Sequence, residues 1–330
     1  MKPKSKIYLI RFIVLGSLRY GRSCVKNCVK VLIGRKPYFT YEDVFFRLYL
    51  RQLLWRQPIR KVTCIGFTGE GPGSQALMMM HAIAFARTAN LTYVHTPFAE
   101  ISDADRPMRE WVNAWEAHFN LGMGEIVTDG DTREIVNFAY NFSDLLPLFG
   151  VDDLTRTLNA TIPEFRRKYY SNKSPRKNDA ITVWVQVRRG DVTPDRYPHR
   201  WTSTSFIAET IAKVRAVLDA HCIKYKICVF SQGDYADIAE LDVSDTEIFL
   251  GADAIWSMQE AIEADILIMA KSSFSYVSAL ISDGIKIYEP CGYPPLNNWV
   301  IHSPNGEFDS ATFEHQLERL IEHRAVNWIA

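Results

Sequence analysis

The chain has 330 residues, more than one hydrophobic core usually organises, so we expect two domains with a binding site between them. Hydrophobic residues make up 47% of the chain and charged residues 23%, which excludes fibrous and disordered proteins. The formal net charge is zero. Six cysteines without a C-x-x-C pair argue against a disulfide framework and a zinc site.

Positive charge is concentrated at the start of the chain. Residues 1–61 contain 15 Lys and Arg residues and two acidic ones. The apolar run Ile7–Leu18 is interrupted by Arg11, and its length of about 18 Å as a helix is shorter than the ~30 Å hydrocarbon core. We therefore expect residues 1–60 to bind an anionic membrane surface rather than nucleic acid. A cleaved signal peptide and a basic helix packed on the protein's own acidic body are the alternatives.

The next segment has the pattern of a βαβ unit. A β-rich run, Lys61–Phe67, is followed by a glycine-containing turn and by a long helical stretch, Ser74–Ala89, with Ser74 as its N-cap. Leu91–His95 is the next predicted strand. The stretch Met108–Asp153 has helical character.

A polar, aperiodic stretch between Tyr170 and Ala180 is the best linker candidate. It divides the chain into an acceptor-side α/β domain, 61–175, and a nucleotide-sugar-binding α/β domain, 176–330. In the second domain, strands are predicted at Ile181–Val187, Lys226–Ser231, Ile266–Ala270 and Lys286–Glu289. Helices are predicted at Ser205–Ala220, Met258–Glu263, Phe274–Ser282 and Ala311–Arg324. This alternation predicts parallel sheets covered on both faces.

Polar residues follow three of these strands, where ligands of open α/β sheets bind. They are Arg188–Asp191, Ser231–Asp234 and Lys271–Ser275. Arginine binds paired phosphate oxygens, and serines at a helix start add donors where the helix dipole favours an anion. The pattern predicts a phosphate site, with a structural ion pair such as Arg189 with Asp191 as the alternative.

Three motifs resemble those of one enzyme superfamily. Gln186–Asp191 (QVRRGD) resembles the H-x-R-R-G-D motif of α-1,2-fucosyltransferases, which has looser relatives in α-1,6- and protein O-fucosyltransferases. Ala264–Ser275 (ADILIMAKSSFS) resembles the later motif, an apolar strand ending in S-S-F-S or S-T-F-S. Gly71–Gln75 (GPGSQ) resembles the early G-x-G-N-Q or G-x-G-C-Q loop. The motifs occur in the order in which that superfamily has them.

The resemblance implies a GT-B architecture, in which two Rossmann-like domains face each other across a cleft and the C-terminal one holds GDP-fucose. Arg188 would then neutralise the departing diphosphate, while Arg189 would support the same loop or contact the donor. Ser272, Ser273 and Ser275 would contact phosphate or ribose. The opposing wall of the cleft would be lined by Gly71, Gly73 and Gln75.

Two positions depart from the superfamily pattern. Gln186 stands where His is usual and cannot become cationic at neutral pH. Ser257 stands roughly where many relatives have an Asp that faces the guanine, and Asp253 or Asp265 could substitute for it. The donor can therefore be another GDP- or UDP-sugar.

The loop after Arg189 offers groups for the acceptor side. It contains Asp191, Asp195 and His199, and Asp195 is the candidate general base, with a solvated loop residue as the alternative. Tyr197 and Trp201 either stack on a sugar or pack.

No metal or other cofactor is expected. The D-x-D triplets Asp103–Asp105 and Asp129–Asp131 do not follow convincing strands, and arginine can neutralise the diphosphate instead.

The sequence therefore predicts an inverting, metal-independent glycosyltransferase that moves fucose from GDP-fucose to a glycan or glycolipid. A different sugar-nucleotide donor and a catalytically silent sugar-nucleotide or glycan-binding protein are the alternatives. The expected location is cytoplasmic and peripheral at the inner membrane surface, in preference to the Golgi.

Overall fold

The computed structural model describes residues 18, 22–26, 60–65, 69–127, 135–137, 153–176, 179–243 and 245–329. The chain divides into two compact units. Unit 1 comprises Met1–Gly71 and Met78–Thr161, and unit 2 comprises Pro72–Leu77 and Ile162–Ala330. The predicted domain ranges 1–60, 61–175 and 176–330 stay predictions, and the basic segment 1–60 lies almost entirely outside the described residues.

Unit 1 contains a parallel sheet with the strand order β3-β2-β1-β4. Its strands are β1 (Lys61–Thr63), β2 (Thr92–His95), β3 (Ile126–Val127) and β4 (Ile135–Asn137). Its helices are α4 (Met108–Phe119) and parts of α3 (Pro72–Thr88) and α5 (Leu154–Tyr170). The predicted strand-helix-strand order is confirmed. The prediction of Ser74 as N-cap is wrong, because Gly71 is the N-cap and Pro72, whose fixed φ suits a first helical position, begins the helix.

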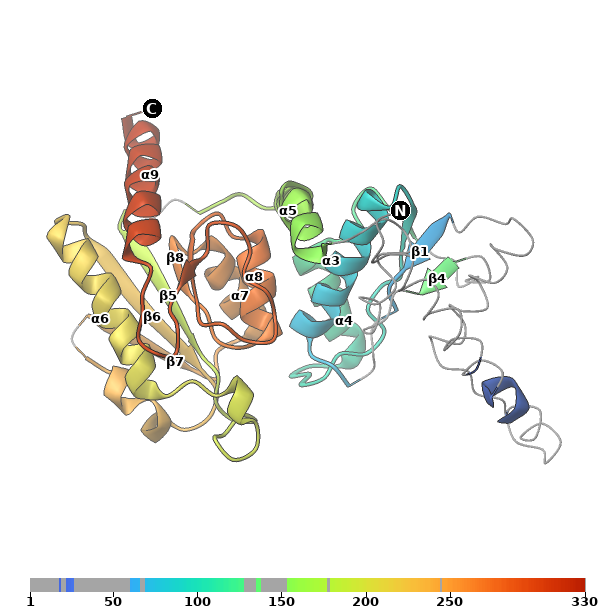
Figure 1. Cartoon of the computed structure of the whole chain (residues 1–330), viewed down its shortest axis with the longest axis horizontal. Coiled ribbons are helices and arrows are strands. Elements are labelled where there is room, and N and C mark those ends of the chain that lie inside the picture. Colours follow the sequence, from blue (N-terminus) through green and yellow to red (C-terminus); the bar gives the residue numbers. More distant parts are fainter. Residues whose placement is uncertain are drawn as a thin grey trace. The chain divides into compact units, whose positions relative to one another are not determined.

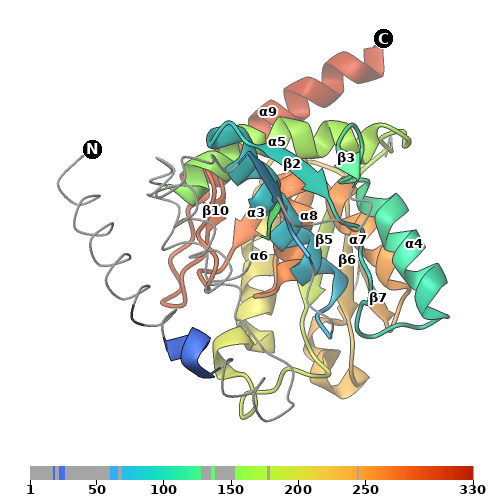
Figure 2. The same cartoon turned by 90° about the vertical axis from the view of Figure 1, so that its right-hand side faces the viewer.

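Unit 2 contains a six-stranded parallel sheet with the order β10-β9-β8-β5-β6-β7. Its strands are β5 (Ile181–Val187), β6 (Tyr225–Ser231), β7 (Thr246–Leu250), β8 (Ile266–Ile268), β9 (Ile285–Tyr288) and β10 (Val300–Ile301). Its helices include α6 (Thr204–Ala220), α7 (Ala254–Glu263), α8 (Ser273–Ile281) and α9 (Ser310–Ile329). Short 3-10 turns lie at η2 (Pro198–Arg200), η3 (Tyr235–Asp237) and η4 (Ala239–Leu241). Figure 2 shows the neighbouring strands β5, β6 and β7 side by side.

Helices cover both faces of this sheet (Figure 1). Alternate residues of β5, from Ile181 to Val187, pack with buried side chains of α6 and α9 in one apolar core. Trp184, on the other face of β5, contacts Trp256 of α7, and α7 packs beside α8. Because both faces are covered, the central strands β5 and β8 are mostly apolar and buried.

The predicted α/β class with two Rossmann-like, GT-B-type domains is confirmed at the level of each unit, because both contain parallel sheets with helical crossovers. Within the described part of Met108–Asp153, the prediction of helical structure is correct for α4 but not for the strands β3 and β4, and residues 128–134 and 138–152 lie outside the described residues. The sequence analysis also missed α5, β7 and β10.

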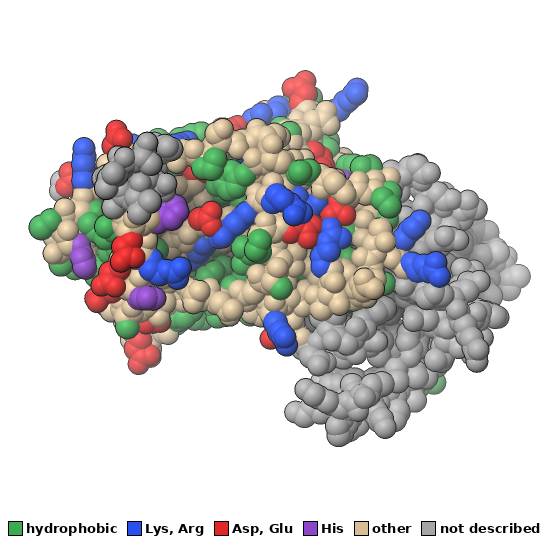
Figure 3. Space-filling model, turned by 90° about the horizontal axis from the view of Figure 1, so that it is seen from above, with side chains coloured by type: hydrophobic (Ala, Val, Ile, Leu, Met, Phe, Trp, Pro, Cys, Tyr) green, Lys and Arg blue, Asp and Glu red, His purple; other side chains and the backbone are tan. Residues whose placement is uncertain are grey.

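Charged side chains of both signs are interspersed on the described face seen in Figure 3. None of the helices within the described ranges is long and apolar enough to span a membrane.

Candidate functional site

The sheet of unit 2 has a switch point between β5 and β8. β5 comes first in the chain, β6 and β7 follow on one side of it, and β8 to β10 follow on the other. Since β5 and β8 pair in parallel, the segments that follow them leave the same edge of the sheet as neighbours. Ligands of open α/β sheets bind in the crevice at such a point. Two predicted motifs, Arg188–Asp191 and Ser272–Ser275, follow these two strands.

Helix α8 begins with the serine motif. The backbone of Ser272 is extended, and its hydroxyl accepts a hydrogen bond from the N–H of Ser275 at 3.2 Å, which makes Ser272 the N-cap. The first turn contains no acidic residue. The first N–H groups of a helix have no intrahelical acceptor and form the positive end of its dipole. This end of α8 therefore favours an anion.

The buried Ser275 links α8 to β5. Its hydroxyl accepts a hydrogen bond from the N–H of Ala270 at 3.0 Å and donates one to the side-chain oxygen of Gln186. The hydroxyls of Ser272 and Ser275 thus have internal partners. Ser273, half-buried at the first helical position, carries the remaining hydroxyl of the motif.

Arg188 is partly exposed at this edge of the sheet. Its side chain is 28% exposed, and Nη2 donates to Oδ2 of Asp191 at 2.7 Å. Its Nε has no hydrogen-bond partner among the described residues. Gly190, between the pair, has a φ of 80°, which side chains rarely tolerate. The ion pair predicted as the structural alternative therefore involves Arg188, not Arg189.

Arg189 points into the protein instead. It is 2% exposed, and Nη2 donates to the carbonyl oxygen of Thr202 at 3.1 Å and to the hydroxyl of Thr204 at 2.9 Å. Its guanidinium lies 3.7 Å from the ring centroid of Trp201. Burial lowers the pKa of Arg189, and the charge of Asp237 opposes this shift. Of the two predicted roles, these contacts fit support of the loop.

The start of α3 also belongs to unit 2 and meets the start of α8. A Cβ atom on Gly73 would lie 2.8 Å from both the backbone nitrogen and Cα of Phe274. Only glycine allows this approach, which brings together the positive ends of two helix dipoles. Neither helix has an acidic residue in its first turn. Gln75 is buried, whereas Gly71 belongs to unit 1, next to Ser102.

Other predicted donor residues lie elsewhere. Asp265 precedes β8 and is therefore at the amino edge of the sheet, where its Oδ2 accepts hydrogen bonds from the N–H and hydroxyl of Thr182 at 2.7 and 2.8 Å. The length of the strands separates it from Arg188, so it does not join the candidate site. Ser257 is half-buried in the first turn of α7, after β7, with β6 between that strand and β5.

The acceptor-side candidates lie in the loop between β5 and α6. Asp195 is exposed within the turn in which the N–H of Tyr197 bonds to the carbonyl of Thr193 at 3.0 Å. His199 is exposed in η2. The structure thus places both on the same loop as Asp191.

The two D-x-D triplets lie in different parts of the chain. Asp103–Asp105 lies in an exposed loop, where a hydrogen bond from Arg106 lowers the pKa of Asp105. Asp129–Asp131 lies outside the described residues. Within the described part of the chain, no group of three or more His, Cys, Asp or Glu side chains is arranged to hold a metal ion.

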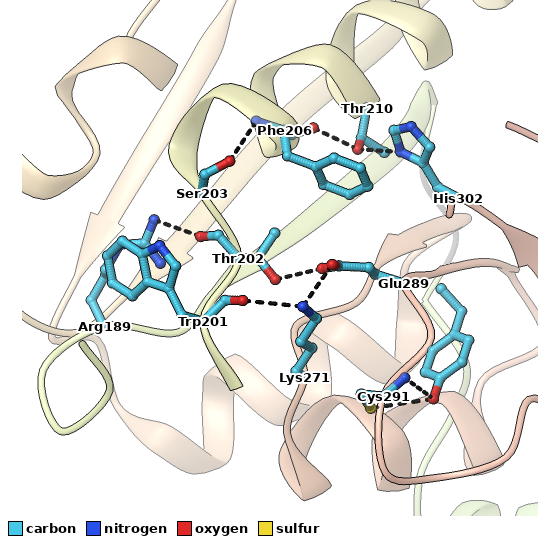
Figure 4. A network of polar contacts seen from close by, with 11 residues as sticks. Arg189, Trp201, Thr202, Ser203, Phe206, Thr210, Lys271, Glu289, Cys291 and His302 are labelled. Atoms are coloured by element: carbon cyan, nitrogen blue, oxygen red, sulfur yellow. Dashed lines mark hydrogen bonds and ion pairs between the residues drawn. The ribbon is translucent and has the colours of Figure 1, made fainter. Parts of the chain in front are cut away.

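The sequence analysis missed an ion pair at this edge (Figure 4). Nζ of Lys271 lies 2.6 Å from Oε1 of Glu289, and the two side chains are 14% and 10% exposed. Both also bond to the end of the β5–α6 loop: Lys271 donates to the carbonyl of Trp201 at 3.1 Å, and Glu289 accepts from the hydroxyl of Thr202 at 2.6 Å. Their positions directly after two apolar strands could have indicated them.

Solved structures of glycosyltransferases are similar to this chain. POFUT1 in complex with GDP is 13% identical, with 69% of this chain and 96% of that chain covered and a TM-score of 0.36. The fucosyltransferase NodZ from Bradyrhizobium is 13% identical, with coverages of 68% and 94% and a TM-score of 0.33. E. coli ADP-heptose LPS heptosyltransferase II is 10% identical, with coverages of 80% and 99% and a TM-score of 0.36. No family model and no curated protein matches the sequence. All three TM-scores are below 0.5.

Proposed function

We propose that this chain is an inverting glycosyltransferase that binds a nucleoside-diphosphate sugar at the carboxyl edge of the unit 2 sheet. The observation that carries the proposal is the parallel pairing of β5 with β8, which brings Arg188 and the start of α8 to the same edge of the sheet. A partly exposed guanidinium and a helix start without acidic residues together suit a diphosphate.

The chemistry requires stabilisation of the leaving diphosphate as the sugar–oxygen bond breaks. Arg188 and the first N–H groups of α8 supply fixed positive charge for this, so the mechanism needs no metal. For inversion, a base must remove the proton of the acceptor hydroxyl as that oxygen attacks the sugar. Asp195 is our candidate for this base, because its carboxylate is exposed on the loop that follows Arg188.

GDP-fucose is the first candidate donor, because the QVRRGD, KSSFS and GPGSQ motifs resemble those of the fucosyltransferase superfamily. Glycans and glycolipids are the proposed acceptors. The main alternative within the same fold is another GDP- or UDP-sugar, since Ser257 stands where relatives have Asp. A silent sugar-nucleotide-binding protein is the second candidate, favoured by Gln186, whose side-chain oxygen is occupied by Ser275.

The test is a panel of GDP- and UDP-sugars with mixed glycan acceptors, read out by nucleotide release with and without EDTA. We expect turnover of one donor that survives chelation. Binding of a donor without turnover would favour the silent protein. Activity lost on chelation and restored by manganese or magnesium would contradict the arginine mechanism.

We also propose that residues 1–60 attach the protein to anionic lipid at the cytoplasmic membrane surface. The support is their excess of Lys and Arg, each worth about 1 kcal/mol near an anionic leaflet. Removal of residues 1–35 should abolish sedimentation with phosphatidylserine vesicles at low salt while nucleotide binding persists. A full-length chain that ignores such vesicles would contradict this proposal.

A further inference from the structure

The loop between β5 and α6 is closed on itself by the residue that precedes it. Arg189 lies two residues after the end of β5. Its guanidinium donates hydrogen bonds to the carbonyl oxygen of Thr202 and to the hydroxyl of Thr204, thirteen and fifteen residues later. The same guanidinium covers the ring of Trp201. Residues 190–203 therefore form a compact loop whose ends are held together, and such loops often carry function.

Two further charged groups fasten the same end of the loop from other strands. Lys271, after β8, donates a hydrogen bond to the carbonyl oxygen of Trp201, and Glu289, after β9, accepts a hydrogen bond from the hydroxyl of Thr202. The two side chains also pair with each other. Figure 4 shows that Lys271, Glu289 and Arg189 converge on the segment Trp201–Thr202. The carboxyl ends of β5, β8 and β9 are thus joined through one short stretch of loop.

The pair is more than a surface contact. Lys271 and Glu289 are 14% and 10% exposed, whereas the pair of Lys226 and Glu247 on β6 and β7 is 48% and 53% exposed. Withdrawing two charges from water is costly, and an apolar pair would often be as stable. Both charged side chains instead make hydrogen bonds to the loop, and these bonds fix the orientation of the loop, which an apolar packing contact does not do.

We propose that Lys271 and Glu289 are a positioning pair that holds the 190–203 loop at the edge where the donor binds. Lys271 directly precedes Ser272, the N-cap of α8, so the pair ties the proposed diphosphate site to the loop that carries Asp195. This inference rests on the proposed function. The pair sets the geometry between the leaving diphosphate and the acceptor base without touching either.

The first experiment reads the loop directly and needs no activity. Hydrogen exchange is measured on the full chain and on Lys271→Met and Glu289→Gln, at amides bonded within the loop such as those of Tyr197 and Arg200. We expect exchange about tenfold faster in both variants, within the range for coupled neighbours. The exposed pair supplies matched controls, Lys226→Met and Glu247→Gln, which should leave the loop unchanged. Unchanged protection in both variants of the buried pair would overturn the proposal.

Folding is monitored with the apolar double variant Lys271→Met/Glu289→Met, which removes both charges together. We expect it to keep its far-UV circular dichroism and thermal transition, because no unpaired charge is left behind. Its loop should exchange as fast as in the single variants. If the loop amides of the double variant exchanged as slowly as in the wild type, the proposal that the charged pair positions the loop would be overturned.

The second experiment separates positioning from direct donor binding. With the donor identified by the panel, each single variant should lower kcat about tenfold while nucleotide Kd stays within about twofold, and the double variant should be no worse than the poorer single one. If Lys271 binds the diphosphate itself, Lys271→Met weakens nucleotide binding and Glu289→Gln does not, which would overturn the proposal. Failure of all donors with the wild type would contradict the proposed function but leave the exchange result standing.

Discussion

The two edges of the six-stranded sheet both carry buried polar groups, but they use them differently. At the amino edge, Asp265 is held by the N–H and hydroxyl of Thr182, and Lys286 donates to the carbonyl of Ser282 at 2.6 Å. At the carboxyl edge, Arg188 is 28% exposed and its Nε has no partner in the described part of the chain. The polar groups at the amino edge thus have partners within the unit, and our proposal is that the partly exposed Arg188 at the carboxyl edge meets a ligand.

Helix α8 connects these two edges and shows the same contrast. Its start at the carboxyl edge has serines and no acidic residue. Its end is covered by two basic side chains, because Arg166 donates to the carbonyls of Ile281 and Ser282 and Lys286 donates to the carbonyl of Ser282. The negative end of the dipole is thus neutralised within the protein. The positive end has no acidic residue in its first turn, which is consistent with the proposed anion site.

The largest effect should come from Arg188. Arg188→Ala removes the main counter-ion of the leaving diphosphate, and we expect kcat to fall about 100- to 1000-fold, as for loss of one oxyanion-type stabiliser. Arg188→Lys should recover little, because a bidentate contact is lost. Steady-state kinetics with the active donor measures both. Arg106→Ala removes another partly exposed arginine paired with an aspartate and serves as the control. Near wild-type activity in Arg188→Ala would contradict the donor-site assignment.

Substitution of two glycines should distinguish the two edges, because Gly284 packs at the amino edge and Gly73 packs against the start of α8 at the carboxyl edge. A Cβ on Gly284 would overlap the carbonyl oxygen of Ala264, so Gly284→Ala should lower the free energy of unfolding by about 1 to 3 kcal/mol or more. Gly73→Ala should push the start of α3 away from Phe274 and weaken nucleotide binding. Gly292, whose Cβ would meet open space, provides a neutral control. Urea unfolding and nucleotide titration distinguish the two effects, and an equal loss of nucleotide affinity in both variants would contradict the comparison.

Lys286 makes the amino edge sensitive to pH. Burial lowers its pKa from 10.5 to about 7, Arg166 adds to the shift and Asp283 opposes it. Below about pH 7 the lysine is charged in both states, and above it the unfolded state holds a proton that the folded state has lost. Its contribution to stability therefore rises between about pH 7 and pH 10.5, by at most about 1.4 kcal/mol per unit.

Urea unfolding at about pH 7 and about pH 9 tests this dependence. Lys286→Met should flatten the rise, while Lys226→Met, which changes an exposed lysine, should not. The same change in the free energy of unfolding between the two pH values in Lys286→Met and the wild type would contradict the lowered pKa of Lys286.

The smallest effect concerns Asp191. It pairs with Arg188 and is 46% exposed, so it competes with a bound diphosphate for the same guanidinium. Exposed pairs are worth roughly 0.2 to 1 kcal/mol, and Asp191→Asn should therefore tighten nucleotide binding by up to about fivefold. Asp234→Asn removes a negative charge after the neighbouring strand β6 and controls for general electrostatics. Equal tightening in both variants would mean that the pair itself is irrelevant.

The sequence predicted the elements with strong apolar or periodic patterns. The seven-residue strand β5, five of whose residues are apolar, was predicted with the observed bounds, and α6 and α8 were predicted within one residue at each end. The strands that were missed are short or lie at the edge of a sheet, such as β7 with its mixed sequence TEIFL. Helix α5 contains Pro163 and was missed as well.

The candidate site was predictable only in part. Parallel strands place the residues that follow them at one edge, so Arg188 and Ser272 could be expected to lie close together. The choice of partners could not be expected, because Arg188 and Arg189 are neighbours with the same chemistry and opposite surroundings. The pairing of Lys271 with Glu289 likewise depends on strand order. Asp265 was predicted as a substitute for the Asp that relatives have near the position of Ser257, although it precedes its strand and so belongs to the other edge.

The most direct measurement is a calorimetric titration of GDP and UDP into the wild type, Arg188→Ala and Asp265→Ala. We predict that one of the two nucleotides binds the wild type with one-to-one stoichiometry. Arg188→Ala should weaken this binding at least about tenfold, because a charge-assisted contact is lost. Asp265→Ala should lower stability and leave the affinity of the folded protein unchanged. Absence of binding by either nucleotide, or equal affinity in the wild type and Arg188→Ala, would contradict a nucleotide-sugar site at the carboxyl edge.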